Sequence, residues 1–376
     1  MRFVQGSAKC LWLACLLSSL PASPLRFSGQ ASAWAIGNYG TDWLGQGGIR
    51  YLPALALGRK TGFGLDVSAN GWVEAGTDFQ DSLGIGLKVK PYRATVRYAR
   101  PRFDARLGLQ KISFGSATLL RPLMWFDRLD PRDPLQMTDG VYALLGRYFL
   151  QNNTNFWAWG LLGNNSTKGS EAFPTEPWKS EFGGRVQVPV PRGEVATSYH
   201  YRRAELSSRG LEQVVWTAPE HRFGLDGKWD VGVGLWFECA ASHLTDPDLL
   251  AFFWQRELTL GSDYTFGIGQ GLNALAEHML ISLTDPAVVW PVSNAQLSAL
   301  SLSYPLGLVD NLRALVYYDW SNRGLYRYLS WQRTLDNWVF NVAAFWNPAH
   351  PAGLAGTSAA STASGNGLMV TVIFNH

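Results

Sequence analysis

The residues with the most regular chemical spacing in this chain are basic ones that alternate with apolar ones. In segment 92–98, tyrosine, alanine and valine occupy every second position, and Arg93 and Arg97 occupy positions between them. The following segment repeats the pattern, with Asp104 and Arg106 between phenylalanine, alanine and leucine. Strict alternation predicts a β-sheet with one apolar and one polar face, so these charges are expected to line a water-filled space.

The same alternation assigns further polar side chains to that face. The candidate lining residues are Arg93, Arg97, Asp104, Arg106, Gln110, Arg185, Arg202, Arg222, Asp226 and Lys228. With Lys179, Glu181 and His200 on the same face, eight side chains are basic and three are acidic. One interpretation is a solvated wall whose charges pair. The other is a basic track, with Arg93, Arg97 and Arg106 as a ladder that favours anions.

A second feature is the connection 111–140, whose ordered part is expected to span 116–140. It combines apolar bulk and three prolines with a run of alternating charges: Arg121, Asp127, Arg128, Asp130, Arg132 and Asp133. Ordinary exposed loops are polar and loose, so this composition predicts a loop that packs. It can fold inward as a constriction, or it can cover the rim of the sheet.

Catalytic and metal chemistry have little support in the sequence. None of His200, His221, His243 and His278 lies in a compact motif with a nucleophile, and the aspartates after His243 read as a polar loop. Beyond the N-terminal segment only Cys239 remains, and no CxxC motif exists. We therefore expect no enzyme activity, no catalytic residue, no metal site and no cofactor.

The element that positions the polar face is a strand, repeated along the chain. About 16 amphipathic strands, within a range of 14 to 18, fit the length after the first thirty-odd residues, although the Gly-rich segment 34–60 is hard to assign. Short turns alternate with long polar connections, and the chain ends on the alternating segment 367–374. We expect an all-β fold, a closed antiparallel transmembrane barrel with water inside and lipid outside. Lipid-facing candidates are Phe103, Leu107, Phe223, Leu225 and Phe340.

The first 33 residues have the three parts of a secretory signal. Arg2 and Lys9 precede an apolar run at 10–20 that is too short for a membrane anchor, and the sequence Ala-Ser-Ala at 31–33 is a cleavage motif. We therefore expect a signal peptide at 1–33 and a barrel at 34–376. Removing the signal leaves 29 basic and 29 acidic residues, so the basic isoelectric point gives no support for a nucleic-acid partner.

Part of the chain resembles a known family. The sequence RLGLQKISFG at 106–115, followed by Asp127 and by DPRDP at 130–134, resembles a segment of large bacterial outer-membrane porins, including alginate-export-like and phosphate-selective-porin-like barrels. The match covers about thirty residues, and only the alternation extends beyond it. The resemblance implies a passive channel, with Arg106, Gln110, Arg121 and Arg132 near the pathway.

The expected function is passive diffusion of small hydrophilic solutes, with a preference for anions, across the outer membrane of a Gram-negative-type bacterium. The alternative is a structural barrel that surrounds or anchors a periplasmic or exported partner. Expected partners are the lipid bilayer, lipopolysaccharide, the outer-membrane assembly machinery and small solutes, with no nucleic acid. The sequence leaves the solute, the pore radius and the oligomeric state open.

Overall fold

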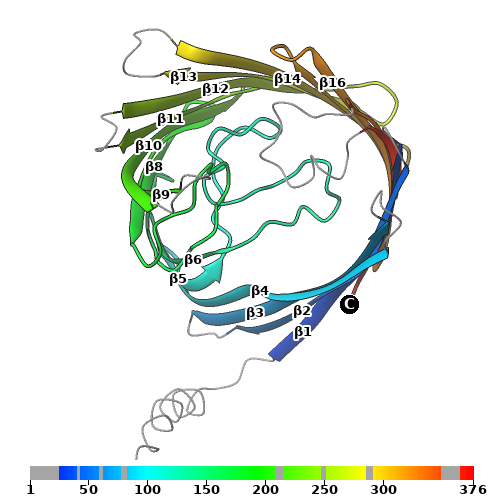
Figure 1. Ribbon diagram of the computed structural model, residues 1–376, viewed down its shortest axis with the longest axis horizontal. Coiled ribbons are helices and arrows are strands. Elements are labelled where there is room, and N and C mark those ends of the chain that lie inside the picture. The colour runs from blue at the N-terminus through cyan, green and yellow to red at the C-terminus, as the bar shows by residue number, and fades with distance from the viewer. Residues whose placement is uncertain are drawn as a thin grey trace, which may run out of the picture.

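The computed structural model describes residues 25–39, 43–58, 62–77, 83–207, 215–246, 251–284, 291–348 and 365–376. Its eighteen strands form one sheet that closes on itself as a ring (Figure 1). Within these ranges, no helix is long and apolar enough to cross a membrane.

The strands follow one another around the ring. Their bounds are β1 Leu25–Tyr39, β2 Trp43–Gly58, β3 Phe63–Thr77, β4 Leu83–Arg100, β5 Phe103–Gln110, β6 Val141–Phe149, β7 Asn155–Leu161, β8 Glu181–Val190, β9 Gly193–Ser207, β10 Val215–Asp230, β11 Gly234–Asp246, β12 Ala251–Phe266, β13 Leu272–Thr284, β14 Pro291–Pro305, β15 Asp310–Asp319, β16 Gly324–Leu335, β17 Trp338–Trp346 and β18 Asn366–Asn375.

Closure depends on the first and last strands. β1 pairs antiparallel with β2 along one edge and with β18 along the other, and Gly29 and His376 exchange backbone hydrogen bonds of 2.9 Å in both directions. Every strand therefore has two neighbours, and no sheet edge is left unpaired. The prediction of a closed antiparallel barrel is confirmed.

The strand count is 18, at the upper end of the expected range and above its centre. The two additional strands are β1 and β2, which occupy most of the Gly-rich segment that was hard to assign. β2 carries glycine at positions 45, 47 and 48. These residues have no side chain to alternate, so the sequence pattern is weak where the strand is present.

Alternation along each strand separates an outer apolar face from an inner face. On β4 the outward Ile85, Leu87 and Val89 are 70%, 72% and 72% exposed, while the alternate residues Lys88 and Lys90 lie on the other face. Among the expected lipid-facing residues, Leu107 is 58% exposed and Phe223 is 48% exposed. An apolar outer face of this kind suits a lipid environment.

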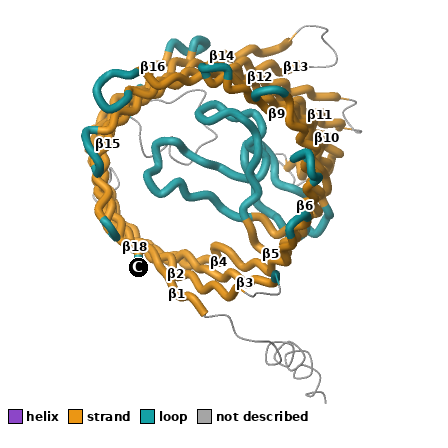
Figure 2. Tube along the Cα trace, turned by 180° about the vertical axis from the view of Figure 1, so that it is seen from behind, coloured by secondary structure: helices purple, strands orange, loops and turns teal. Residues whose placement is uncertain are grey.

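The two ends of the barrel differ. At one end, here called the short-turn end, the described connections such as 101–102 and 191–192 are tight turns. From the opposite end, two long connections, 111–140 and 162–180, enter the ring (Figure 2). These inward connections make the interior of the barrel the place to look for function.

The expected signal peptide lies mostly outside the described residues, because 1–24 are not described. The expected cleavage motif at 31–33 falls inside β1, where Ala31 pairs with Phe374 on one side and with Tyr51 on the other. A cut after Ala33 would remove residues 25–33 of β1. The pairing of these residues with β2, and of residues 30–33 with β18, would be lost.

Candidate functional site

The connection 111–140 packs inside the barrel through its apolar residues. Phe114, Leu123 and Trp125 are 7%, 1% and 1% exposed and form one cluster with inward residues of β6 and β7, such as Leu145 and Trp159. Burying a large apolar side chain contributes about 1.5–3 kcal/mol each. The structure therefore places this segment, here called the inner loop, in the lumen rather than over the rim.

Two wall carboxylates hold the inner loop by its backbone. Glu277 on β13 accepts hydrogen bonds from the amides of Thr118, Leu119 and Leu120 at 2.7, 2.8 and 2.6 Å. Glu238 on β11 accepts from two further loop amides, at 2.8 and 2.5 Å. Charge-assisted hydrogen bonds of this kind are stronger than neutral ones. The loop is thus fixed to the wall across the lumen from the strands that begin and end it.

Sequence reasoning missed both glutamates. Each lies between apolar inward residues, Trp236 and Ala240 on β11 and Leu275 and Met279 on β13, because this part of the wall packs against the loop. The inner face around each glutamate therefore looks apolar, and the alternation gives no sign of a polar side. An isolated acid on such a strand is the signal that could have found them.

The rest of the inner loop contacts other parts of the wall. Arg313 on β15 donates to the carbonyl of Pro131 at 3.2 Å, and Tyr328 on β16 donates to the carbonyl of Arg132 at 3.0 Å. On the side of β2–β4, Arg93 donates to the carbonyl of Thr138 at 2.9 Å. The loop therefore spans the lumen and touches the wall on several sides.

Four of the six charged residues expected at a constriction form ion pairs with each other inside the loop. Arg121 pairs with Asp127 at 3.0 Å, and both side chains are less than a tenth exposed. Arg128 donates to Gly169 in the second inward connection. These groups stabilise the loop and its neighbour instead of presenting charge to a solute.

The other three are Asp130, Arg132 and Asp133. Arg132 pairs with Asp130 at 2.9 Å. Burial acts to lower the pKa of Arg132, but its hydrogen bonds to Asp130 outweigh this, so the pKa lies above the ordinary value. Asp133 accepts hydrogen bonds from the amides of Leu135 and Met137, and its burial raises the pKa of that carboxyl.

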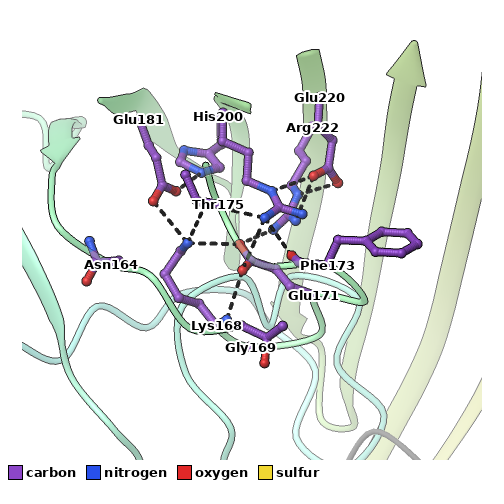
Figure 3. Close-up of polar contacts among 12 residues, drawn as sticks. Asn164, Lys168, Gly169, Glu171, Phe173, Thr175, Glu181, His200, Glu220 and Arg222 are labelled. Carbon is purple, nitrogen blue, oxygen red and sulfur yellow. Dashed lines mark hydrogen bonds and ion pairs between the residues drawn. The ribbon is translucent and has the colours of Figure 1, made fainter. Parts of the chain in front are cut away.

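The second inward connection, 162–180, was expected only as a long polar loop. It carries Lys168 and Glu171 into a buried network with residues of β8–β10 (Figure 3). The network, here called the balanced network, has three basic and three acidic side chains around one histidine: Lys168, Arg202, Arg222, Glu171, Glu181, Glu220 and His200.

The contacts of the balanced network leave little charge exposed. Arg222 reaches Glu220 at 2.9 Å and Glu171 at 3.4 Å, and its side chain is 4% exposed. Arg202 pairs with the same two glutamates and is 2% exposed. The candidate lining residues Arg202 and Arg222 are therefore structural ion-pair partners.

Arg185 and Asp226 are also paired and buried. The guanidinium donates to both carboxylate oxygens of Asp226 at 2.5 and 2.9 Å, and Ser116 of the inner loop donates to the same carboxylate at 3.0 Å. Each side chain is 4% exposed. Lys228, two residues further along β10, is exposed and lies 5.6 Å from the centre of the Trp236 ring.

The candidate residues of β4 and β5 are arranged differently. Asp104 accepts two hydrogen bonds from Arg97 and two from Arg106, at 2.7–3.2 Å. The side chains of Arg97 and Arg106 are 46% and 28% exposed. Gln110 is buried and donates to backbone carbonyls of Arg106 and Ala143, so it supports the wall.

A third arginine, Arg147 on β6, joins this group and was not among the expected residues. It lies opposite Asp104 in the β5–β6 ladder. The other inward residues of β6, such as Val141 and Leu145, are apolar because they pack on the inner loop. The alternation rule therefore gave no polar face for β6. Arg97, Arg106, Arg147 and Asp104 are here called the arginine cluster.

Two glycines allow the inward connections to approach their partners. Gly115 has φ +104° and lies against the Glu238 carboxylate, so a Cβ there would overlap the carboxylate oxygens. Gly169 has φ +44°, and a Cβ would overlap the backbone of Met124, where the two connections cross. Both positions need glycine for conformation and for space.

Metal and thiol chemistry gain no candidate from the geometry. In the part of the chain that the structure describes, no group of three or more His, Cys, Asp or Glu side chains is placed to hold a metal ion. Cys239 is a half-buried free thiol on β11.

Comparisons with known proteins place the fold. No protein-family model matches the chain, and no curated protein matches it either. Among solved structures it is similar to OpdQ of Pseudomonas aeruginosa, with a TM-score of 0.57 and 9% identity over 94% of this chain and 98% of that one. OccK7 (OpdD) of the same organism gives 0.56 and 10% over 94% and 99%.

A third similar structure is OmpT, an outer membrane protein of Vibrio cholerae in its trimer form. It gives a TM-score of 0.53 and 11% identity over 95% of this chain and 100% of that one. At identities this low, the structural similarity shows a shared fold alone. The chain has the fold of bacterial outer-membrane β-barrel proteins, as the resemblance at 106–134 implied.

Proposed function

We propose that this protein is an outer-membrane channel through which small hydrophilic solutes diffuse passively, with a preference for anions. The barrel supplies a path lined by protein, with an apolar outer face for lipid. The observation that carries the anion preference is the arginine cluster on the lumen wall, in which Asp104 binds Arg97 and Arg106 and lies opposite a third arginine, Arg147, in the β5–β6 ladder. Uncompensated positive charge in a confined space concentrates anions there.

The charge distribution supports a narrower version of the basic track than the sequence suggested. Arg185, Arg202 and Arg222 have acidic partners and are buried, so they contribute little net charge to the lumen. Arg97 on β4 and Arg106 on β5 are partly exposed. Arg93 lies on the same face of β4 as Arg97, four residues earlier. The ladder is therefore confined to β4–β6, next to the inner loop.

The test is the reversal potential across a KCl gradient in a planar bilayer. We expect the native barrel to favour chloride, and the triple variant Arg93→Gln, Arg97→Gln, Arg106→Gln to lose most of that preference. The matched control is Arg100→Gln, which removes a charge from the opposite face of β4. Preference should weaken with added salt, because the screening length falls from about 10 Å at 0.1 M to about 3 Å at 1 M.

Two results would contradict the proposal. A native pore that favours potassium, or a triple variant with unchanged selectivity, removes the basis for anion preference. Absence of any conductance from correctly folded barrels favours the alternative, a structural barrel that surrounds or anchors a partner protein.

Location and processing belong to the same proposal. We expect the barrel in the outer membrane, in contact with lipopolysaccharide and inserted by the assembly machinery, after removal of an N-terminal signal. Mass spectrometry of the purified barrel determines the mature N-terminus. A start at or before Leu25 leaves β1 whole, whereas the start at Trp34 expected from the sequence removes the part of β1 before it.

A further inference from the structure

The outer face of β12 carries a charged side chain on a surface that is otherwise suited to lipid. Arg256 is exposed and shares this face with Leu260, which is 55% exposed. Among the described residues no acid pairs with Arg256, and its guanidinium carbon lies 5.6 Å from the centre of the Trp254 ring. An arginine on the lipid face of a barrel is costly in the middle of the membrane and is tolerated near the membrane boundary. The depth of Arg256 and its missing counter-charge therefore need an account.

The position of Arg256 along β12 places it at a membrane boundary. β12 ends at Phe266 at the short-turn end, ten residues after Arg256. A strand rises about 3.3 Å per residue and is tilted by about 40°, so Arg256 lies about 25 Å from that end along the barrel axis. The apolar band of an outer-membrane barrel is about 25 Å tall, and its short turns lie on the periplasmic side. Arg256 is therefore level with the headgroups of the outer leaflet.

Polar rings continue from Arg256 across the neighbouring strands on the same outer face. His243 on β11 is paired with Trp254, and the centres of the two rings are 4.4 Å apart. His221 on β10 is paired with His243, and its Nδ1 lies 2.8 Å from the hydroxyl of Tyr199. Imidazole and guanidinium groups supply N–H donors, and the guanidinium adds a positive charge. Donors and positive charge at headgroup level suit a lipid phosphate.

On the side of this row toward the membrane centre, the outer face is hollowed. A cavity of about 540 Å³ lies over β12–β15, and its lining includes Ser262, Ala276 and Leu300. Leu260 also lines it, and Leu260 lies four residues from Arg256 on the same face of β12. The hollow thus begins within the apolar band, where an acyl chain gains free energy by apolar contact.

The polar groups of the hollow are paired within the protein. The hydroxyl of Ser298 accepts a hydrogen bond from the indole of Trp320 at 2.9 Å and lies 2.9 Å from Nδ1 of His278. Ser298 therefore needs no polar partner from a lipid, and an acyl chain can pack over it without leaving its hydroxyl unpaired.

We propose that Arg256, with His243 and His221 beside it, binds a phosphate group of lipid A, the membrane part of lipopolysaccharide, and that one acyl chain of the lipid occupies the hollow. A guanidinium matches the geometry of phosphate oxygens and supplies the counter-charge. The order of the two parts along the membrane normal also fits, with the phosphate site at the boundary and the hollow below it. The inference rests on the proposed location in the outer membrane and does not depend on conduction.

A second outward arginine supplies a matched control. Arg100 at the end of β4 lies at the short-turn end, and its Nε donates to the hydroxyl of Tyr98 at 2.8 Å. Aromatic residues gather at both boundaries of a membrane without binding a particular lipid. An arginine beside a tyrosine therefore accounts for an ordinary boundary, whereas the arginine with two histidines and a hollow is confined to the outer-leaflet side.

The experiment measures lipid binding to the purified barrel in mild detergent by native mass spectrometry. The probes are lipid A, lipid A from which the phosphates have been removed, and phosphatidylglycerol. We expect the native barrel to retain phosphorylated lipid A, and Arg256→Leu to bind it about tenfold more weakly, the typical cost of a lost hydrogen bond to a charged group. Arg100→Leu should bind lipid A as the native barrel does. Heat-modifiable migration on gels shows that each variant is folded.

The hollow is tested by a variant that leaves Arg256 in place. Ala276→Phe puts a ring into the hollow from the outer face, so we expect it to weaken the binding of lipid A several-fold. Unchanged binding by this variant overturns the placement of the acyl chain. Equal binding of lipid A and its dephosphorylated form, or of lipid A by the native barrel and Arg256→Leu, overturns the phosphate site. Equal retention of phosphatidylglycerol overturns the assignment to lipid A.

Lipid binding and conduction are measured on the same preparations, so the two proposals fail separately. A folded barrel that conducts but retains no lipid A overturns the lipid site and leaves the channel function intact. A barrel that binds lipid A through Arg256 but carries no current supports the lipid site, and only the channel function is then lost.

Discussion

Two regions of the barrel interior use arginine in opposite ways. In the balanced network on β8–β10, Arg202 and Arg222 each pair with Glu220 of β10 and with Glu171 of the second inward connection. In the arginine cluster on β4–β6, Asp104 pairs with Arg97 and Arg106, which are partly exposed, and a third arginine, Arg147, lies opposite Asp104 in the ladder. Both regions looked alike in the sequence, because both place basic residues on the polar face of alternating strands.

The difference shows that the number of basic residues on a face does not determine its potential. The partners that neutralise Arg202 and Arg222 include Glu171, which lies far from their strands in the sequence and arrives on a connection. In the arginine cluster the acid that binds Arg97 and Arg106 is Asp104 on the neighbouring strand, and the inner loop contributes an aromatic residue, with Phe114 against Trp157.

The largest expected effect comes from removing one acid from the balanced network. Glu220→Gln leaves Arg202 and Arg222 buried with reduced compensation, and breaking a buried pair from one side costs about 3 kcal/mol or more. The matched change in the other region, Arg97→Gln, removes a half-exposed partner and should cost about 1 kcal/mol or less. Urea unfolding of both variants measures the difference. Equal destabilisation would mean that the two regions do not differ in burial as the structure indicates.

The next effect tests which face of β5 meets lipid. Leu107→Arg places a charge on the outer face and should destabilise the barrel by about 2–4 kcal/mol at mid-membrane depth. Its neighbour Arg106 already carries a charge at the same depth on the inner face, and Arg106→Leu should change stability by about 1 kcal/mol or less. The folding free energies of both variants, measured in lipid vesicles, test which face of β5 meets lipid. Similar costs for both changes would show that the faces are assigned wrongly.

A smaller effect concerns the loop that separates the two regions. Glu277→Gln replaces one carboxylate oxygen with an NH₂ group, which faces amide donors instead of accepting from them. We expect a cost of about 1–3 kcal/mol and larger current fluctuations as the inner loop shifts. Glu257→Gln is the control, since Glu257 is a wall acid on β12 whose side-chain bond is to Gln255. Quiet, native-like currents from Glu277→Gln would show that the apolar cluster alone holds the loop.

Much of the fold follows from alternation, since β3–β18 coincide with segments in which apolar and polar residues alternate. The weak cases have a physical cause. β2 contains three glycines in its first half, and β6 is apolar on both faces except at Arg147, because one face meets lipid and most of the other meets the inner loop. Alternating apolar and polar residues indicate a strand with lipid on one side and water on the other. The pattern is therefore lost where protein covers the inner face of the strand.

The site was harder to predict than the fold for the same reason. The composition of 111–140 indicated a packing loop, and the structure places it in the lumen. Its anchors, Glu238 and Glu277, lie more than a hundred residues away and accept from backbone amides, which have no sequence signature. Pairing between Arg202 and Glu171 likewise depends on where a connection folds. Charges that meet only through tertiary structure cannot be paired from a single sequence.

The smallest expected effect gives the sharpest view of the charge difference between the two regions. Asp104→Asn removes the single acid of the arginine cluster and adds one unit of net positive charge beside the lumen. At a separation of about 8 Å in water, one unit charge attracts chloride and repels potassium by about 0.5 kcal/mol each, and screening at 0.1 M salt roughly halves both energies, so the chloride-to-potassium permeability ratio should rise roughly twofold. On β10, beside the balanced network, Asp226→Asn makes the same change, but that carboxylate is 4% exposed behind the inner loop, where it pairs with Arg185. We expect it to lower stability and to leave the reversal potential nearly unchanged. A larger shift in selectivity from Asp226→Asn than from Asp104→Asn would reverse the assignment of the two regions and place the conducting path along β8–β10.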